Sequence, residues 1–572
     1  MDYLHKLAEH LPSSVTDQAT LTPVTGAVAA FTAFLALYAI KNASSSSQKR
    51  SLLPPGPPTK WFWQNPFPEK DVARSLAALA NQYGGVYTLS AGSNNFVVVA
   101  SYDAALEIME KAGGSTVDRP RAVVASELMA RSGRLLFEGA GDHFRTVRKY
   151  VTPLPPLTMS ALTKEDERAV HTALQPKAAK GYQTIQIDHA RHVILNIMAD
   201  PDKFADHLQA YASSVTIQIM YGKCTPTSAS SPEVQRILLA GKNGGTALVP
   251  GRFIIESLPA LKPFHRLGGM KGICDALENT PGLWWLGRAL GAFGWEMAEW
   301  ARHEQELGDD MMGRVQREMA EGTAGPSFMR NMIETQDEHK LPNYELAELT
   351  SILFGAGSDT TTVGLNFAML AAAAFPEELK KVHQELDRVV GGERAPNFDD
   401  MGNLPLLQAF IEEVLRWRPI IPIGIAHGAN KDVHYNGFVI PEGTMVLGSH
   451  WAISRDPTAY PNPECFLPSR WLENPSSPPS SAKLRTDLRF FTYGFGRRVC
   501  PGQHVASRSL FLNIALIFWA FDVVRPSKDT VYDLDGWKDT AVTKPPPFKV
   551  GFAKRLDEGV VRRALDEMGG DN

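Results

Sequence analysis

The stretch FTYGFGRRVCPGQHVASRSLF, residues 491–511, is the most informative part of this chain. A single cysteine, Cys500, lies there between an aromatic-rich approach and a helical segment, with Arg498 two residues earlier. Inward-turned amides of a glycine-rich loop, together with the start of a helix, stabilise a sulfur anion. The pattern predicts a lone thiolate, with Arg498 placed for an anionic group; the alternative is a buried structural cysteine in a turn. The loop is shaped by Gly494, Gly496, Pro501 and Gly502.

The composition supports a cysteine that acts singly within a large folded body. Of 572 residues, 44% are apolar and 21% are charged, which is enough for a sizeable core. Lys and Arg number 58 against 62 acidic residues, so no basic excess exists for a nucleic-acid backbone and we expect no nucleic-acid partner. Four widely spaced cysteines without a CxxC pair exclude a disulfide scaffold and a zinc ribbon: Cys224, Cys274, Cys465 and Cys500.

The N-terminal region predicts a membrane anchor. Residues 21–40, LTPVTGAVAAFTAFLALYAI, carry no charge, and as a helix they would span about 30 Å, the thickness of a bilayer core. A cleavable signal peptide is the alternative, but the run is long and the tail before it is acidic on balance. Basic residues follow the run, which puts the bulk of the chain in the cytosol. The expected organisation is a lumenal tail (1–20), a transmembrane anchor (21–40), a Ser/Pro-rich linker (41–60) and one domain (61–572).

The body of the chain predicts one large, mainly α domain with a minor β-sheet. Helical periodicity dominates, as in residues 377–390, whereas strand signals are short and sparse. Further helices are expected at 404–417 and 503–521, strands at 85–89, 96–99 and 433–440, and an exposed loop at 473–483.

A second motif, ILFGAGSDTTTVG at residues 352–364, suggests a helix that passes close to a ligand. Small residues at Ala356 and Gly357 permit a close approach, and the hydroxyl of Thr360 can bond the preceding turn and open the helix locally. The neighbouring carboxylate of Asp359 can supply protons. The alternative is an ordinary glycine-containing core helix with a polar edge.

Two further segments carry charges at regular spacing. Glu413 and Arg416 lie three residues apart, on one face of the predicted helix, where they can pair. On its own this spacing usually gives an exposed ion pair. Arg470 lies further along the chain, in FLPSRW at residues 466–471.

Taken together, these segments resemble the cytochrome P-450 superfamily of haem-thiolate monooxygenases. The family pattern F-x-x-G-x-R-x-C-x-G matches this sequence except that Tyr493 stands at the leading Phe. The resemblance extends from about Leu53 to the C-terminus. The four motifs follow one another in the family's order, at Thr360, Glu413, Arg470 and Cys500.

The resemblance implies a role for each residue. Cys500 would be the thiolate ligand to the iron of haem b, with Tyr493 stacked under the porphyrin and Gly357 letting the helix pass over it. Asp359 and Thr360 would be the catalytic pair, and Glu413, Arg416 and Arg470 the structural network. The segment GDHFRTVRKY, 141–150, resembles the family's W-x-x-x-R helix with Phe144 replacing Trp. Haem propionates would then be held by Arg148, Arg498 and His427, although His427 could instead be a solvated histidine at a strand end.

By the same resemblance, the protein is expected to use NADPH and O2 to insert one oxygen atom into an apolar small molecule. Electrons would come from a membrane-bound flavoprotein, NADPH-cytochrome reductase. The expected location is the endoplasmic reticulum membrane, with a single pass and a cytosolic catalytic domain. The chain looks most like the filamentous-fungal O-methylsterigmatocystin oxidoreductase-like group, which implies secondary or xenobiotic metabolism. Specificity is expected from residues 121–137, 247–264, the distal helix, 420–426 and 540–543.

Two other functions stay open from the sequence. A reductase-independent haem-thiolate isomerase or dehydratase is disfavoured by Asp359 and Thr360, and a non-catalytic haem sensor would not explain that pair. Residues 264–282 look like additional material relative to the group. The aromatic residues that follow are either core, which we favour slightly, or dip into the membrane at the active-site entrance: Trp284, Trp285, Phe293, Trp295 and Trp300.

Overall fold

The computed structural model describes residues 52–59, 65, 71–91, 94–129, 135–151, 181–225, 227–247, 279, 296–475, 481–537 and 541–569. Several sequence predictions lie outside these residues: the tail, the anchor at 21–40, and most of the linker and of the added segment 264–282. Cys274 and four of the five aromatic residues, all but Trp300, lie outside them too. No described helix combines the length and the apolar character that a membrane crossing requires.

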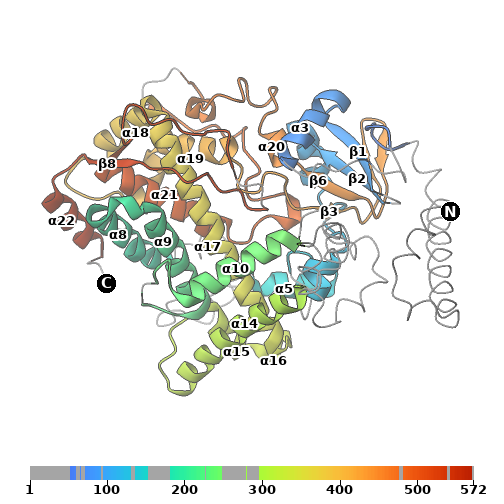
Figure 1. Ribbon diagram of the computed structural model, residues 1–572, viewed down its shortest axis with the longest axis horizontal. Helices are drawn as coiled ribbons and strands as arrows, with labels where there is room; N and C mark the ends of the chain where they lie inside the picture. The colour runs from blue at the N-terminus through green and yellow to red at the C-terminus, as the bar shows by residue number, and fades with distance from the viewer. Residues whose placement is uncertain are drawn as a thin grey trace.

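A long buried helix, α17 (Asn343–Ala374), runs through the middle of the molecule (Figure 1). It packs against α9 (Phe204–Tyr221), α10 (Pro232–Ala247), α14 (Met297–Ala320) and α21 (Gln503–Ala520). Glycines allow this close packing, because a Cβ added at Gly364 would come within 2.9 Å of Leu510 Cδ2 on α21.

Most of the remaining helices surround α17, whereas α3 (Val72–Tyr83) and α20 (His450–Ile453) lie beside the largest described sheet (Figure 1). The predicted helices at 377–390, 404–417 and 503–521 are present as α18, α19 and α21, each within one residue at its start and end. The α-helices are α3 (Val72–Tyr83), α4 (Tyr102–Ala104), α5 (Asp142–Val151), α8 (Gln183–Ala199), α15 (Phe328–Glu334), α16 (Gln336–His339), α18 (Pro376–Val389), α19 (Pro405–Trp417), α20 (His450–Ile453) and α22 (Glu558–Gly569). Short 3-10 or π turns are η4 (Ala105–Lys111), η5 (Val123–Leu128), η7 (Pro201–Lys203), η9 (Phe398–Asn403), η10 (Pro468–Trp471) and η12 (Gly496–Arg498).

The largest described sheet has four strands in the order β1-β2-β6-β3. Its strands are β1 (Val86–Ala91), β2 (Asn94–Val99), β6 (Met445–Gly448) and β3 (His427–Gly428). The β1–β2 and β6–β3 pairs are antiparallel and the β2–β6 pair is parallel. The register places His427 beside Val446, so this sheet fixes the position of a predicted site residue. The mainly α prediction with a minor sheet is confirmed.

The single strand predicted at 433–440 is wrong. The chain forms a hairpin there, β4 (Val433–Tyr435) and β5 (Phe438–Ile440), joined by Asn436 and Gly437. These two residues have φ angles of 49° and 81°. Tight two-residue hairpin turns require positive φ, which Asn-Gly adopts most readily. A second two-stranded ribbon is formed by β7 (Phe521–Val524) and β8 (Gly551–Lys554).

Candidate active site

The cysteine loop between η12 and α21 is held by its own backbone. The Cys500 N–H donates to the Tyr493 carbonyl at 2.8 Å, which closes the loop. Gly494 and Gly496 have φ angles of 84° and 50°, in the left-handed region that glycine tolerates. A Cβ at Gly496 would also lie 2.9 Å from the carbonyl oxygen of Met109. Glycine is therefore required at this point both by conformation and by space.

The Cys500 thiol lies in surroundings suited to a metal-bound thiolate. The side chain is partly exposed. Burial by the surrounding protein raises the pKa of the thiol, and the Gly502 amide and the Arg148 charge lower it by a smaller amount. The loop alone thus favours the neutral thiol, whereas a metal cation bound at sulfur removes the proton. The donor type and the glycine cradle fit an iron–thiolate bond.

Tyr493 gives the loop a second attachment. Its hydroxyl lies 2.8 Å from Ser507 Oγ on α21, and its pKa is raised by burial. The Phe of the family pattern could not make this hydrogen bond. The departure from the pattern therefore adds a tie between the cysteine loop and the helix that follows it.

Arg498 is held by two backbone carbonyls and keeps one nitrogen free. Its Nε donates to the Val117 carbonyl and its Nη2 to the Glu138 carbonyl, both at 2.6 Å. Its Cζ lies 3.6 Å from the ring centre of Phe144, the residue that replaces Trp in the α5 motif. The remaining nitrogen, Nη1, is buried without a hydrogen-bond partner among the described residues. A buried donor of this kind costs stability unless a ligand satisfies it.

Two more guanidinium groups gather near Arg498. Arg148 donates to the Val499 carbonyl, and Arg119 Nη1 donates to the Ala426 carbonyl at 2.6 Å. Burial, and next the charges of Arg498 and Arg148, lower the pKa of Arg119 to about 9 against the opposing effect of Asp118. The cluster therefore has excess positive charge. The two carboxylates of a haem would fit this excess.

His427 is buried rather than solvated, with an exposed fraction of 4%. Its Nδ1 lies 2.8 Å from the Thr116 carbonyl, which only the protonated nitrogen can bond. Burial, and next the charge of Arg119, lower the pKa of His427 to about 3, so the imidazole is neutral. The alternative of a solvated histidine at a strand end is thus wrong. The side chain lies close enough to the arginine cluster for the charge of Arg119 to lower its pKa.

Arg119 is a candidate binding residue that the sequence analysis missed. The segment 116–119 supplies carbonyls to both His427 and Arg498 and pairs with β3 through Asp118 and Gly428. No local spacing links Arg119 to the cysteine motif, because their proximity arises only from the fold. The adjacent charges of Asp118 and Arg119, followed by Pro120, are a local signal that could have drawn attention to it.

The Ala356–Thr360 face of α17 is incompletely covered by protein. Ala356 is exposed and Thr360 half-buried, although the helix is largely buried elsewhere. The Thr360 hydroxyl donates to the Ala356 carbonyl at 2.7 Å, as predicted from its position one turn later. The helix stays α throughout, so the predicted local opening is not present. Gly357 faces α9 instead, since a Cβ there would lie 2.9 Å from Thr216, which is a packing reason for this glycine.

Asp359 is paired with a residue that the sequence analysis did not anticipate. Lys544 Nζ lies 2.6 Å from Asp359 Oδ1. The two side chains are 44% and 20% exposed, so the pair is partly shielded from water. The predicted proton-supplying carboxylate is therefore in contact with the C-terminal part of the chain.

Glu413 is the centre of a fully buried charge network. Arg416 binds it through two nitrogens at 2.7 and 2.8 Å, and Arg470 Nε lies 3.1 Å from both of its oxygens. Trp471 Nε1 and the Leu467 amide donate to the same carboxylate at 3.0 and 2.7 Å. The structure thus brings the three predicted network residues together and ties α19 to η10.

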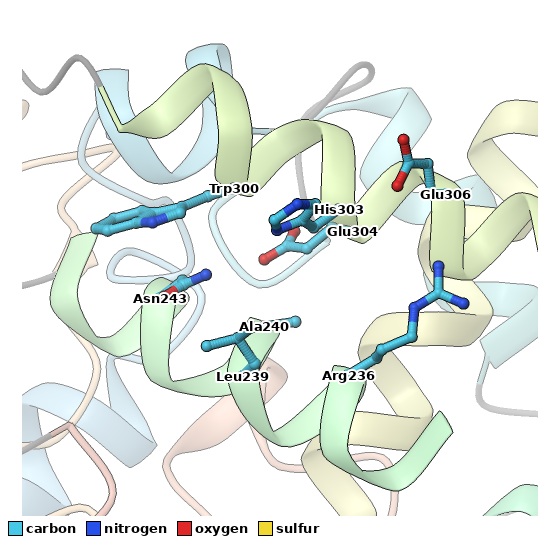
Figure 2. Close-up of a pocket in the computed structure, with 8 residues that line it drawn as sticks. All are labelled: Arg236, Leu239, Ala240, Asn243, Trp300, His303, Glu304 and Glu306. Carbon is cyan, nitrogen blue, oxygen red and sulfur yellow. The ribbon is translucent and has the colours of Figure 1, made fainter. Parts of the chain in front are cut away.

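A hollow of about 270 Å³ lies apart from these motifs, between α10 and α14 (Figure 2). In Figure 2 the indole of Trp300 and the ring of His303 extend from α14 towards Leu239 and Asn243 of α10. Trp300 is half-buried and also packs against an apolar cluster that includes Val124. This contact agrees with the favoured core interpretation for Trp300.

Comparison with known proteins decides the family. The cytochrome P450 profile matches residues 54–227 and 297–552, most of the chain. The chain belongs to the cytochrome P450 family. It is similar to cytochrome P450 monooxygenase 88 of Postia placenta, at 38% identity over 91% of this chain and 95% of that protein. Cytochrome P450 monooxygenase 113 of the same fungus is 37% identical over 94% and 99% of the two chains. A solved zebra fish cytochrome P450 has the same fold, with a TM-score of 0.63, 22% identity, and coverage of 86% and 100%.

Membership of the cytochrome P450 family establishes the reaction class and the cofactor. The protein is an oxidoreductase that acts on paired donors and incorporates one oxygen atom. Its cofactor is a haem held by a cysteine thiolate, used with O2 and electrons from a reductase partner. A non-catalytic haem sensor is thereby set aside.

Proposed function

We propose that this cytochrome P450 is an NADPH-dependent monooxygenase of an apolar small molecule, served by a flavoprotein NADPH-cytochrome reductase. The observation that carries the proposal is Cys500, the single cysteine of a glycine-shaped loop that lies beside a guanidinium cluster with an unpartnered buried nitrogen. Cys500 would hold the haem iron, while Arg119, Arg148, Arg498 and His427 would hold its propionates. The bound haem supplies the activation of O2.

The isoleucine-rich segment 420–426 supports an apolar substrate. Residues 420–426 contain four isoleucines, and Ile420, Ile421, Ile423 and Ile425 are each half-buried. Ile420 Cδ1 lies 3.7 Å from where a Cβ at Gly364 of α17 would be. A ligand bound against such side chains would gain from removal of apolar surface from water and would find few polar partners there.

Product analysis tests the function. The purified protein, NADPH and a flavoprotein reductase are incubated under isotopically labelled O2 with a panel of apolar secondary metabolites and xenobiotics. We expect at least one product that carries a single labelled oxygen atom, formed only when reductase is present. Conversion of a substrate without reductase and without labelled oxygen would favour the isomerase or dehydratase alternative instead.

Thr360→Ala is expected to leave the fold, the haem spectrum and substrate binding intact but to divert NADPH consumption into hydrogen peroxide. In the proposed function, the Thr360 hydroxyl holds the water that delivers protons for cleavage of the O–O bond. Without this hydroxyl, more of the reduced oxygen leaves as hydrogen peroxide before the bond breaks. Asp359→Asn is expected to slow turnover by up to about 10²-fold, since proton supply is impaired while water substitutes in part. The ratio of product to NADPH consumed checks the Thr360 variant, and the rate of product formation, measured together with that ratio, checks the Asp359 variant.

Thr362→Ala is the matched control for Thr360→Ala. Thr362 makes the same bond to the carbonyl one turn earlier, at 2.7 Å to Ser358, but is buried. We expect the Thr362 variant to keep wild-type coupling. If the Thr360 and Asp359 variants also kept wild-type coupling and rate, the pair would be structural in this protein.

We further propose that residues 21–40 anchor the protein to the endoplasmic reticulum membrane with the catalytic domain in the cytosol, in a pathway of secondary or xenobiotic metabolism. The length of the uncharged run and the basic residues after it support this placement. Deletion of residues 1–40 is expected to move much of the protein into the soluble fraction with haem binding intact. Complete pelleting of the truncated protein would point to a second membrane contact.

A further inference from the structure

The residues around Lys544 form a fixed loop next to the Asp359–Thr360 face of α17. The Thr543 amide donates to the Ile420 carbonyl at 2.9 Å, and the Thr543 hydroxyl donates to the Pro419 carbonyl at 3.2 Å. Thr543 is almost fully buried, with 1% of its surface exposed. Pro545 follows Lys544 and restricts it to extended backbone. The backbone at Lys544 is thus fixed by the Thr543 hydrogen bonds before it and by Pro545 after it, and its side chain contacts Asp359 from there.

The same loop contacts the isoleucine-rich segment and α10. Its anchor, Ile420, belongs to the isoleucine-rich segment, and a Cβ at Gly245 of α10 would lie 3.4 Å from the Cβ of Ala541. The Thr543–Ile420 bond therefore ties the loop that carries Lys544 to the isoleucine-rich segment. The 2.6 Å bond from Lys544 Nζ to Asp359 Oδ1 then connects this loop to α17.

The pair also explains how a carboxylate is kept beside Thr360. Asp359 is only 20% exposed, and a carboxylate that is largely removed from water is costly unless it is paired. Lys544 provides both a countercharge and a directed hydrogen bond to one oxygen, Oδ1, which leaves Oδ2 for water. No other ion pair to Asp359 is found in the described part of the chain.

We propose that Lys544 is a positioning residue that holds the Asp359 carboxylate for proton delivery. This inference rests on the proposed function, in which Asp359 supplies protons. Asp359 takes up a proton from a water molecule and passes it on, which restores the carboxylate, and the water regains its proton from the solvent. Lys544 acts only through the position of Asp359.

A double-mutant cycle tests the inference in the full-length holoenzyme. Lys544→Met, which keeps the length of the side chain without its charge, should lower the ratio of product to NADPH consumed by roughly 2- to 150-fold, the range for coupled neighbouring residues. Lys544→Arg should retain most of the wild-type ratio. In an Asp359→Asn background, Lys544→Met should cause no further loss. Lys549→Met, which removes an exposed charge from the same segment, is the control and should match wild type.

A second measurement does not depend on turnover. Amide hydrogen exchange at residues 541–544 should be faster in Lys544→Met and in Asp359→Asn, to the same extent, because either change removes the same tie. Unchanged exchange in both variants, or losses of coupling that add in the double variant, would overturn the inference. Faster exchange in both variants, combined with a wild-type protein that oxidises none of the panel, would support the Lys544–Asp359 contact but contradict the proposed function.

Discussion

Cys500→Ser is expected to abolish monooxygenase turnover while leaving a folded protein. A serine hydroxyl is not ionised at neutral pH and is a poor ligand for iron, so the haem loses the electron-rich sulfur that its oxygen chemistry needs. The loop itself should survive, because its closing bond runs from the residue 500 amide to the Tyr493 carbonyl and does not use the sulfur. Product formation with reductase and NADPH, together with circular dichroism, checks this expectation.

The other described cysteines provide matched controls. Cys224 and Cys465 are exposed. Cys465 contributes only its carbonyl to the Arg416 and Arg470 network, at 3.2 Å to each, and serine would preserve that carbonyl. Cys224→Ser and Cys465→Ser are therefore expected to keep full activity. Retention of wild-type turnover by the Cys500 variant would refute its assignment as the iron ligand.

Glu413→Ala is expected to prevent accumulation of the haem-loaded protein. The change leaves the Arg416 and Arg470 guanidiniums in a buried place without their carboxylate, a loss of about 3–5 kcal/mol for a buried pair. Whole domains are stable by only about 5–15 kcal/mol. The damage should reach the cysteine loop, because Trp471, which binds Glu413, shares an apolar cluster with Phe491 and Phe495.

An ion pair on the surface serves as a control that shows how much of the effect of Glu413→Ala depends on burial. Glu334 lies 2.7 Å from Arg330, the same separation as Glu413 from Arg416, but its side chain is 40% exposed rather than fully buried. Glu334→Ala should cost about 1 kcal/mol or less. Haem content and thermal unfolding of the two variants are measured side by side. Equal, small effects would contradict a stabilising role for the buried network.

Much of the site was predictable because its residues lie in short motifs. The neighbours of Cys500 act within a few residues of it, so glycine and charge spacing reveal the loop directly. Glu413 and Arg416 share one helical turn, and Arg470 follows in a short segment of its own. The helices at α18, α19 and α21 were predictable for a similar reason, since apolar periodicity reports which face is buried.

The contacts that were missed join distant parts of the chain. Arg119 reaches the Arg498 cluster, and Lys544 reaches Asp359, only after the whole domain has folded, and no local pattern encodes either meeting. Gly357 was assigned to the approach of a cofactor, whereas its neighbour is Thr216 on α9, a packing partner that periodicity cannot name. At 433–440 an Asn-Gly turn signal was present and was overlooked.

The reduced, CO-bound absorption spectrum of the intact wild-type protein tests the central claim most directly. Thiolate ligation by Cys500 predicts a Soret band at the long-wavelength position that is diagnostic of a sulfur ligand, and the band should be absent from Cys500→Ser and present in Cys465→Ser. A Soret band at the shorter wavelength typical of a histidine ligand, from correctly folded wild-type protein, would contradict the account.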